Sequence, residues 1–230
     1  MGIALPPPLR EGDRLNSAEF LRRWEAMPRL KHAELIGGTV FFMPSPLSAF
    51  HSDAHTEMID WLLAYKSHTP GCHTGIDCTW KMGPDDVPQP DLFLRILPES
   101  GGQSTLDGAY PAGAPELIVE ISGSSLSRGL GIKLDLYRKA GVREYLTVQL
   151  QPRQLLWRHL SRGCYRELAP DDDGLLRSRT FPGLWLDRAA VWQPKRSVRT
   201  AVDKGVQSAK HAAFVRRLAT KLKKCLHLSD

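Results

Sequence analysis

Three acidic residues of this sequence lie in or beside apolar segments, where charged side chains are rare. They are Glu34 in AELIGG, Asp91 in QPDLFL and Glu120 in PELIVEIS. A carboxylate on a core strand costs several kcal/mol unless it is paired, hydrogen-bonded or bound to a cation. We therefore expect each of the three to have a specific partner.

Asp91 and Glu120 can share one partner if their strands are neighbours in a sheet. Side chains alternate along a strand, so Asp91 points with Phe93 and Glu120 points with Ile118. Two carboxylates that converge at one end of a sheet repel each other unless a cation lies between them. Hard oxygen ligands in this number suit Mg²⁺, with Mn²⁺ as a substitute. The pair thus predicts a divalent-metal site.

A lysine follows on the next predicted helix, over residues 127–140. Leu130, Leu134 and Tyr137 recur at helical spacing on its apolar face, and Lys133 lies among them. A lysine on that face is directed toward the sheet. Beside a metal it could orient or deprotonate the attacking water and stabilise charge on a phosphoryl group. Phosphodiester hydrolysis requires both tasks.

The elements that must position these residues follow from periodicity and turn signals. A capping-box pattern, Asn16 with Glu19, starts a helix over 17–26. The other expected elements are two strands around Gly37-Gly38, a helix from His51 to Lys66, strands near 76–82 and in QPDLFLRI, a surface loop at 97–114, a central strand PELIVEIS, strands REYLTVQL, QLLWRHL and CYRELA, and a closing FPGLWLD segment. Helices early and strands late indicate a mixed α/β sheet rather than an alternating doubly wound one.

The charge is concentrated at one end of the chain. The net charge is +6, and residues 195–230 hold ten Lys or Arg against two Asp, which leaves −2 for the rest. We therefore divide the chain into a Pro-rich leader (1–15), one domain (16–193) and a basic helical tail (194–230). An amphipathic helix is predicted in the tail from Val202, Val206, Ala209, Ala213, Leu218 and Leu222. It could dock on the domain, bind a partner, touch an acidic membrane, follow nucleic-acid phosphates, or stay solvated.

Several other classes of protein receive little support. No apolar run approaches the ~18 residues of a membrane span, and the start lacks the layout of a signal peptide, so we expect a cytoplasmic protein without a membrane span. The four cysteines form neither a disulfide framework nor a CxxC pattern. A zinc site near His51 and His55 matches no familiar ligand spacing. Acyl transfer lacks a GxSxG elbow.

Five segments in order, AELIGGTVFFMPSP, QPDLFLRI, PELIVEISGSS, KLDLYRKAGVREY and FPGLWLD, give the chain a family resemblance. Over about residues 16–192 it resembles the Uma-type family of predicted endonucleases, within the PD-(D/E)XK (restriction-endonuclease-like) nuclease superfamily. Pro90-Asp91 matches the family's PD, and Glu120 matches its second acid. Ser122 stands where the superfamily places its lysine. In this group the next helix usually supplies that lysine, here Lys133.

The resemblance implies a restriction-endonuclease-like α/β fold and a metal-dependent endonuclease. Its catalytic residues would be Asp91, Glu120, Lys133 and Glu34, and its metal ligands Asp91, Glu120 and Ile121. Lys133 would lie near the attacking water, with Glu34 as an auxiliary ligand or orienter. One departure is the pair of glycines in SRGLGIK, which weakens the helix that presents Lys133 by about 1 kcal/mol for each glycine.

A structural alternative remains open for each acid. Asp91 could be a turn residue after Pro90, and Glu120 could form a buried ion pair with Arg95 or Lys133. The corresponding alternative function is a catalytically silent nucleic-acid or protein-binding module on the same fold. For the enzyme, the expected partner is nucleic acid, DNA before RNA, and a homodimer that cuts both strands is one open arrangement.

Overall fold

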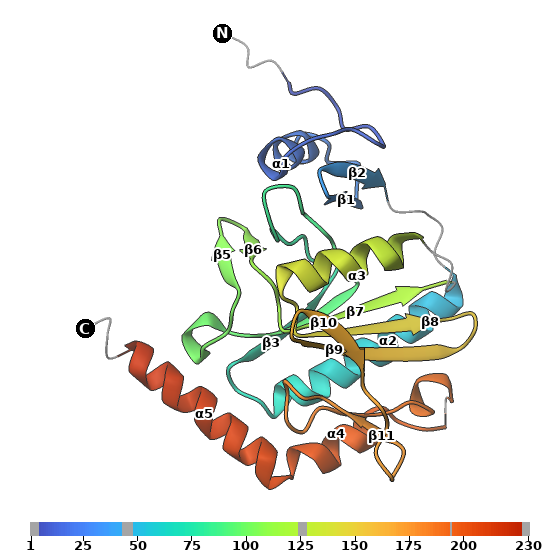
Figure 1. The fold of residues 1–230 in the computed structure, drawn as a ribbon, viewed down its shortest axis with the longest axis vertical. Helices are drawn as coiled ribbons and strands as arrows, with labels where there is room; N and C mark the ends of the chain where they lie inside the picture. Colours follow the sequence, from blue (N-terminus) through green and yellow to red (C-terminus); the bar gives the residue numbers. More distant parts are fainter. Residues whose placement is uncertain (1–4, 43–47, 124–127, 194, 227–230) are drawn as a thin grey trace.

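A six-stranded mixed sheet forms the centre of the computed structural model, with strand order β10-β9-β8-β7-β4-β3 (Figure 1). The structure describes residues 5–42, 48–123, 128–193 and 195–226. The strands of the sheet are β3 (Cys72–Ile76), β4 (Leu92–Ile96), β7 (Leu117–Ser122), β8 (Glu144–Gln149), β9 (Gln154–Ser161) and β10 (Cys164–Glu167). Only β7 and β8 run parallel within this sheet. The predicted mixed α/β class is confirmed, with PELIVEIS in an interior strand.

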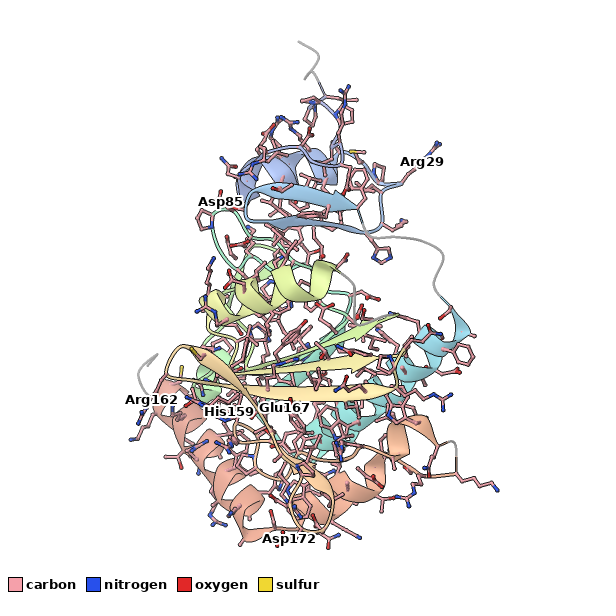
Figure 2. The ribbon with its side chains drawn as sticks, turned by 45° about the vertical axis from the view of Figure 1, so that its right-hand side comes forward. Arg29, Asp85, His159, Arg162, Glu167 and Asp172 are labelled. Atoms are coloured by element: carbon pink, nitrogen blue, oxygen red, sulfur yellow. The ribbon has the colours of Figure 1, made fainter. Side chains whose placement is uncertain are left out.

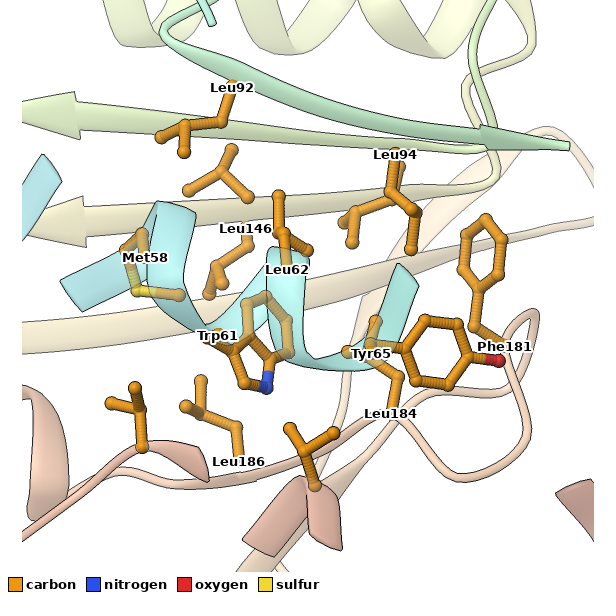
Figure 3. Packing of buried hydrophobic residues seen from close by; sticks show 14 of the residues in the cluster. Met58, Trp61, Leu62, Tyr65, Leu92, Leu94, Leu146, Phe181, Leu184 and Leu186 are labelled. Carbon is orange, nitrogen blue, oxygen red and sulfur yellow. The ribbon is translucent and has the colours of Figure 1, made fainter. Parts of the chain in front are cut away.

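Two helices cover opposite faces of the sheet, α2 (Ala49–Ser67) and α3 (Arg128–Ala140) (Figure 1). Alternation along the strands gives each face its own core. On the α2 face, Met58, Trp61, Leu62 and Tyr65 pack with apolar side chains of β4, β7 and β8 (Figure 3). On the α3 face, the buried side chains of that helix pack against the strand residues that alternate with those facing α2. The start predicted at residue 127 and the side chain of Leu130 lie outside the described part of the chain.

An N-terminal unit sits on the far side of α3, at the top of Figure 1. It comprises α1 (Ser17–Glu25), β1 (Ala33–Ile36) and β2 (Thr39–Phe42), with a small core of its own. Asn16 Oδ1 accepts a hydrogen bond from Glu19 N at 2.9 Å, so the predicted helix cap is confirmed. Gly37 and Gly38 both have positive φ, as a two-residue hairpin turn requires. The backbone of Asp85 closes on this turn (Figure 2), accepting from Gly38 N at 2.8 Å.

Two helices follow the sheet, α4 (Arg199–Val206) and α5 (Ala209–Leu226), and both pack on the domain. Val198, Val202, Phe214 and Leu218 are buried in the same core as α2. Of the open interpretations of the tail, docking is the one that the described residues show. The division of the chain at residue 194 stays a prediction.

The tail is two helices rather than one. The first ends at Val206, and Gln207 and Ser208 separate it from the second. This interruption changes the phase of the apolar stripe, so Ala209 and Ala213 are exposed although the continuous pattern placed them inside. Across the described ranges, no helix combines the length and the hydropathy needed to cross a bilayer.

Three other segments differ from expectation. The strand expected near 76–82 lies at Cys72–Ile76, because Asp77 adopts a positive φ of 47° that ends it. The loop at 97–114 holds a 3-10 turn and a hairpin, η1 (Pro98–Ser100), β5 (Thr105–Asp107) and β6 (Tyr110–Ala112). The closing segment gains a strand partner, since β11 (Leu175–Arg177) pairs with β12 (Trp185–Asp187), ahead of η2 (Ala190–Trp192).

Candidate active site

The two strands that carry Asp91 and Glu120 are neighbours. Strands β4 and β7 pair antiparallel with Leu92 opposite Val119. Continuing this register by one residue brings Asp91, immediately before β4, opposite Glu120. Side chains of directly opposed residues project from the same face, with Cβ atoms about 5 Å apart. The face is the one that α3 covers.

Lys133 lies between two carboxylates from distant parts of the chain. Its Nζ is 2.9 Å from Glu34 Oε1 and 3.0 Å from each oxygen of Glu120. The lysine is only 4% exposed, and Glu34 and Glu120 are similarly buried. Tyr137, one helical turn after Lys133, donates its hydroxyl to Glu120 Oε1 at 2.6 Å. We call Glu34, Asp91, Glu120 and Lys133 the lysine cluster.

Backbone N–H groups bond two carboxylates of the lysine cluster, those of Asp91 and Glu34. Ile121 N donates to Asp91 Oδ2 at 2.6 Å, and Gln89 N donates to Glu34 Oε1 at 2.7 Å. Reciprocal backbone bonds between Leu35 and Val87, at 3.1 and 2.7 Å, tie the hairpin that carries Glu34 to the segment leading into Asp91. The position of Glu34 is therefore coupled to the approach to β4.

The lysine cluster contains three acids for one ammonium group. Burial raises the pKa of Glu120 to about 8, although Lys133 opposes the shift. Burial likewise raises the pKa of Asp91, with Lys133 again opposing. For Lys133 burial acts to lower the pKa, but Glu120, Glu34 and Asp91 outweigh it and the net pKa is raised. Without a further cation, the lysine is charged and the acids compete for protons.

The donor atoms fit a hard divalent cation by type. Asp91 and Glu120 supply carboxylates, and Ile121 can add its carbonyl. The N–H and C=O of one strand residue point to the same side, and Ile121 N–H already points to Asp91. All three ligands are oxygens, which suit Mg²⁺ or Mn²⁺.

Their arrangement, however, is that of an ion pair. Both Glu120 oxygens are bonded to Lys133. Within the described residues, no group of three or more His, Cys, Asp or Glu side chains is arranged to hold a metal. A cation at Asp91 would therefore have to take Glu120 from Lys133.

The structure decides between the two partners that the sequence allowed for Glu120. The buried partner of Glu120 is Lys133 and not Arg95. His51 and His55 stack with ring centroids 6.2 Å apart, and their positive charge would lower the pKa of Asp91. Neither histidine was linked to Asp91 by the sequence, because helix α2 and β4 meet only in the fold.

Tyr137 was expected only as an apolar core residue. Its hydroxyl instead bonds Glu120. The available signal was its spacing of four residues from Lys133, which places the two side chains on one helical face.

The family of this chain is given by its match to known proteins. A family described as "Putative restriction endonuclease" (Uma2) matches residues 18–189. The chain belongs to the Uma2 family. The match contains the whole lysine cluster, while α4 and α5 lie beyond it.

Among solved structures, one similar chain is described as "a putative nuclease belonging to DUF820 from Anabaena variabilis". It is 13% identical, with a TM-score of 0.54, and the match covers 81% of this chain and 98% of that one. At such identity the likeness shows the fold alone. No curated protein matches. Family and fold are those of restriction-endonuclease-like nucleases, so the resemblance seen in the sequence of this Uma2 chain is confirmed.

Proposed function

We propose that this chain is a divalent-metal-dependent endonuclease that hydrolyses phosphodiester bonds of nucleic acid, with DNA as the first substrate to test. The observation that carries the proposal is the lysine cluster itself. Two opposed carboxylates at the end of adjacent strands, with a buried lysine against them, supply the charges that phosphodiester hydrolysis needs. A homodimer would offer one such site to each strand of a duplex.

Asp91, Glu120 and the carbonyl of Ile121 would hold Mg²⁺ or Mn²⁺. When bound, the cation would polarise the phosphodiester and lower the pKa of a coordinated water. Glu120 has to leave Lys133 to serve as a ligand, and Glu34 keeps that lysine in place, since Glu34 Oε1 lies 2.9 Å from its Nζ. Glu34 is therefore assigned a positioning role.

Lys133 serves as a charge rather than as a base in this proposal. Its pKa is raised in the described arrangement, so the group is an ammonium that cannot accept a proton. An ammonium can stabilise a phosphoryl oxygen and orient water. Tyr137, bonded to Glu120 Oε1, limits the orientations open to that carboxylate.

Cleavage of supercoiled plasmid and labelled duplex, with Mg²⁺ or Mn²⁺ against EDTA, tests the proposal. Lys133→Met is expected to lose cleavage by at least about a hundredfold, as loss of an electrostatic stabiliser usually does. The matched control is Lys139→Met, which removes the same charge from the same helix at a side chain that is 69% exposed. Equal activity of parent and Lys133→Met would contradict the assignment.

The alternative is a catalytically silent binding module on the same fold. The observation that favours this alternative is that both oxygens of Glu120 already accept hydrogen bonds from Lys133. Such a module would bind nucleic acid without Mn²⁺ binding and without cleavage. Calorimetric titration with Mn²⁺ therefore separates the two functions.

A further inference from the structure

Arg95 on β4 is a buried cation, and two of its three guanidinium nitrogens have no acceptor among the described residues. The side chain is 9% exposed, and neither Nε nor Nη1 has a hydrogen-bond partner in the described protein. Glu120, which the sequence allowed as a partner of Arg95, is bonded to Lys133 instead. A buried guanidinium left in this state is costly.

Trp80 adds a third unpaired donor. Its indole is fully buried, and Nε1 also lacks a partner among the described residues. The guanidinium of Arg95 lies over the Trp80 ring, with its carbon 6.0 Å from the ring centre, in a cation–π contact. Buried polar groups nearly always have partners, so these three unpaired donors on neighbouring side chains indicate an acceptor from outside the chain. Water could satisfy the N–H groups, whereas an anion would satisfy them and also pair with the charge.

No carboxylate of the described residues accepts a hydrogen bond from Nε or Nη1 of Arg95. Continuing the register of β4 and β7 places Glu116 opposite Arg95. Its two oxygens accept from Ile96 N and Gln103 N, at 2.8 and 3.1 Å. On the other side, Arg95 pairs with exposed His73 of β3, the edge strand. An anion bound to Arg95 would therefore displace no ion pair of the described residues.

Arg95 shares a sheet face with the lysine cluster. Asp91, Phe93 and Arg95 alternate with the residues that face α2, and four residues of strand span about 13 Å. A planar guanidinium can bind two phosphate oxygens at once, and an indole N–H can donate to a third. We propose that Arg95 and Trp80 form a second phosphate site, which takes a phosphate of the substrate strand away from the bond that is cleaved. The identity of that strand rests on the proposed function, whereas phosphate binding does not.

Thermal unfolding with inorganic phosphate, at constant ionic strength and in EDTA, tests the site directly. The parent melting temperature is expected to rise by about 3 °C or more at saturating phosphate. Arg95→Met should not respond. Arg166→Met is the matched control, because Arg166 is an exposed residue of β10, and it should follow the parent. An equal response in Arg95→Met, or none in the parent, would overturn the proposal.

A second measurement covers the case that Arg95→Met does not fold. In the parent protein, the indole N–H resonance of Trp80, assigned with Trp80→Phe, should shift as phosphate is added. A resonance that does not move while phosphate saturates would leave these donors to buried water and overturn the site.

Duplex binding in EDTA then identifies the source of the phosphate. Arg95→Met should bind a short duplex about tenfold more weakly than parent and Arg166→Met. Its log–log salt slope should fall by about 0.9, the value for one phosphate contact. Unchanged duplex binding beside a lost phosphate response would overturn the substrate-strand assignment. Failure of the nuclease proposal looks different, because cleavage would be absent while both binding responses persist.

Discussion

At the scale of single residues, the site depends on a competition for Glu120. The carboxylate is 5% exposed, with bonds to Lys133 and Tyr137. A buried ion pair offsets only part of the cost of desolvating its members. A divalent cation brings more positive charge than the ammonium group, so in the proposed function Glu120 would exchange Lys133 for the cation.

The titration of Glu120 predicts how stability depends on pH. Its pKa rises from 4.5 to about 8 in the folded protein because it is buried, so between these values the folded state binds the additional proton. This contribution to the free energy of unfolding is fully present below pH 4.5 and is lost as pH rises through 8. Without metal, the stability of Glu120→Gln relative to the parent should therefore increase by about 3 kcal/mol between pH 5.5 and pH 8.5. Urea unfolding at both pH values measures this, and parallel pH profiles would contradict it.

Metal binding should show the opposite pH dependence. A cation must displace the proton and the lysine from Glu120, so the affinity for Mn²⁺ should increase as pH rises from 6.5 to 8.5. Glu120→Gln should lose most of this affinity, while Lys133→Met should retain it or bind more tightly, because its competitor is gone. Calorimetric titrations of all three proteins decide the point. Equal binding to the parent and Glu120→Gln would leave Glu120 as half of a structural ion pair.

The acids of the site could be predicted from the sequence because their surroundings are apolar. Their partners could not. Arg95 and Lys133 were equal candidates for Glu120, since the choice depends on strand register and on the helix face above it. Likewise, nothing in the local sequence shows that Gln89 N and Ile121 N hold Glu34 and Asp91, because these are main-chain groups.

At the scale of elements, α3 matters most because it presents both Lys133 and Tyr137. The two glycines in SRGLGIK are expected to lower the stability of this helix. A Cβ added at Gly131 would have no atom within 4 Å, so the position is open to a side chain. The helix could therefore be strengthened without disturbing the lysine two residues later.

Gly131→Ala is expected to stabilise the protein by about 1 kcal/mol, because alanine loses less backbone entropy in a helix. Thermal unfolding measures the gain, and Mn²⁺ affinity should stay unchanged. Gly183→Ala is the contrasting variant. Gly183 has a φ of +92°, and its added Cβ would lie 2.9 Å from the carbonyl oxygen of Gly205, so stability should fall. A loss of stability in Gly131→Ala would show that α3 has a constraint other than propensity.

The elements were predicted where the apolar pattern was clear, as in the continuous run of β7 and the helical spacing of α2. They were missed where one or two residues determined the outcome. The left-handed Asp77 ended a strand early, and two residues after Val206 restarted a helix in a new phase. Both are local backbone events that a hydrophobic pattern does not record.

At the scale of the whole molecule, the basic tail is bound into the main core. The close approach of Gly183 and Gly205, where an added Cβ on either would clash with the other backbone, holds α4 against the end of the domain. Phe214 and Leu218 extend the same contact along α5. The charge of the tail is therefore displayed on a fixed surface.

A chain that ends at residue 194 should be strongly destabilised, because it loses Val198, Val202, Phe214 and Leu218 from the core. Burial of four such side chains is worth about 6 kcal/mol or more. A chain that ends after Leu218 keeps all four and should melt close to the parent. Calorimetry of the two truncations tests this. Equal melting temperatures would show that the domain ends where the sequence first suggested, before the tail.

The order in which the chain is synthesised has a consequence for the lysine cluster. Its members stand at positions 34, 91, 120 and 133, so the ribosome delivers every acid before the lysine. An unfinished product that stops before α3 has the acids without their lysine, and a chain cleaved between β2 and α2 has Glu34 on a separate fragment. In the proposed nuclease, cleavage activity would therefore require the completed domain.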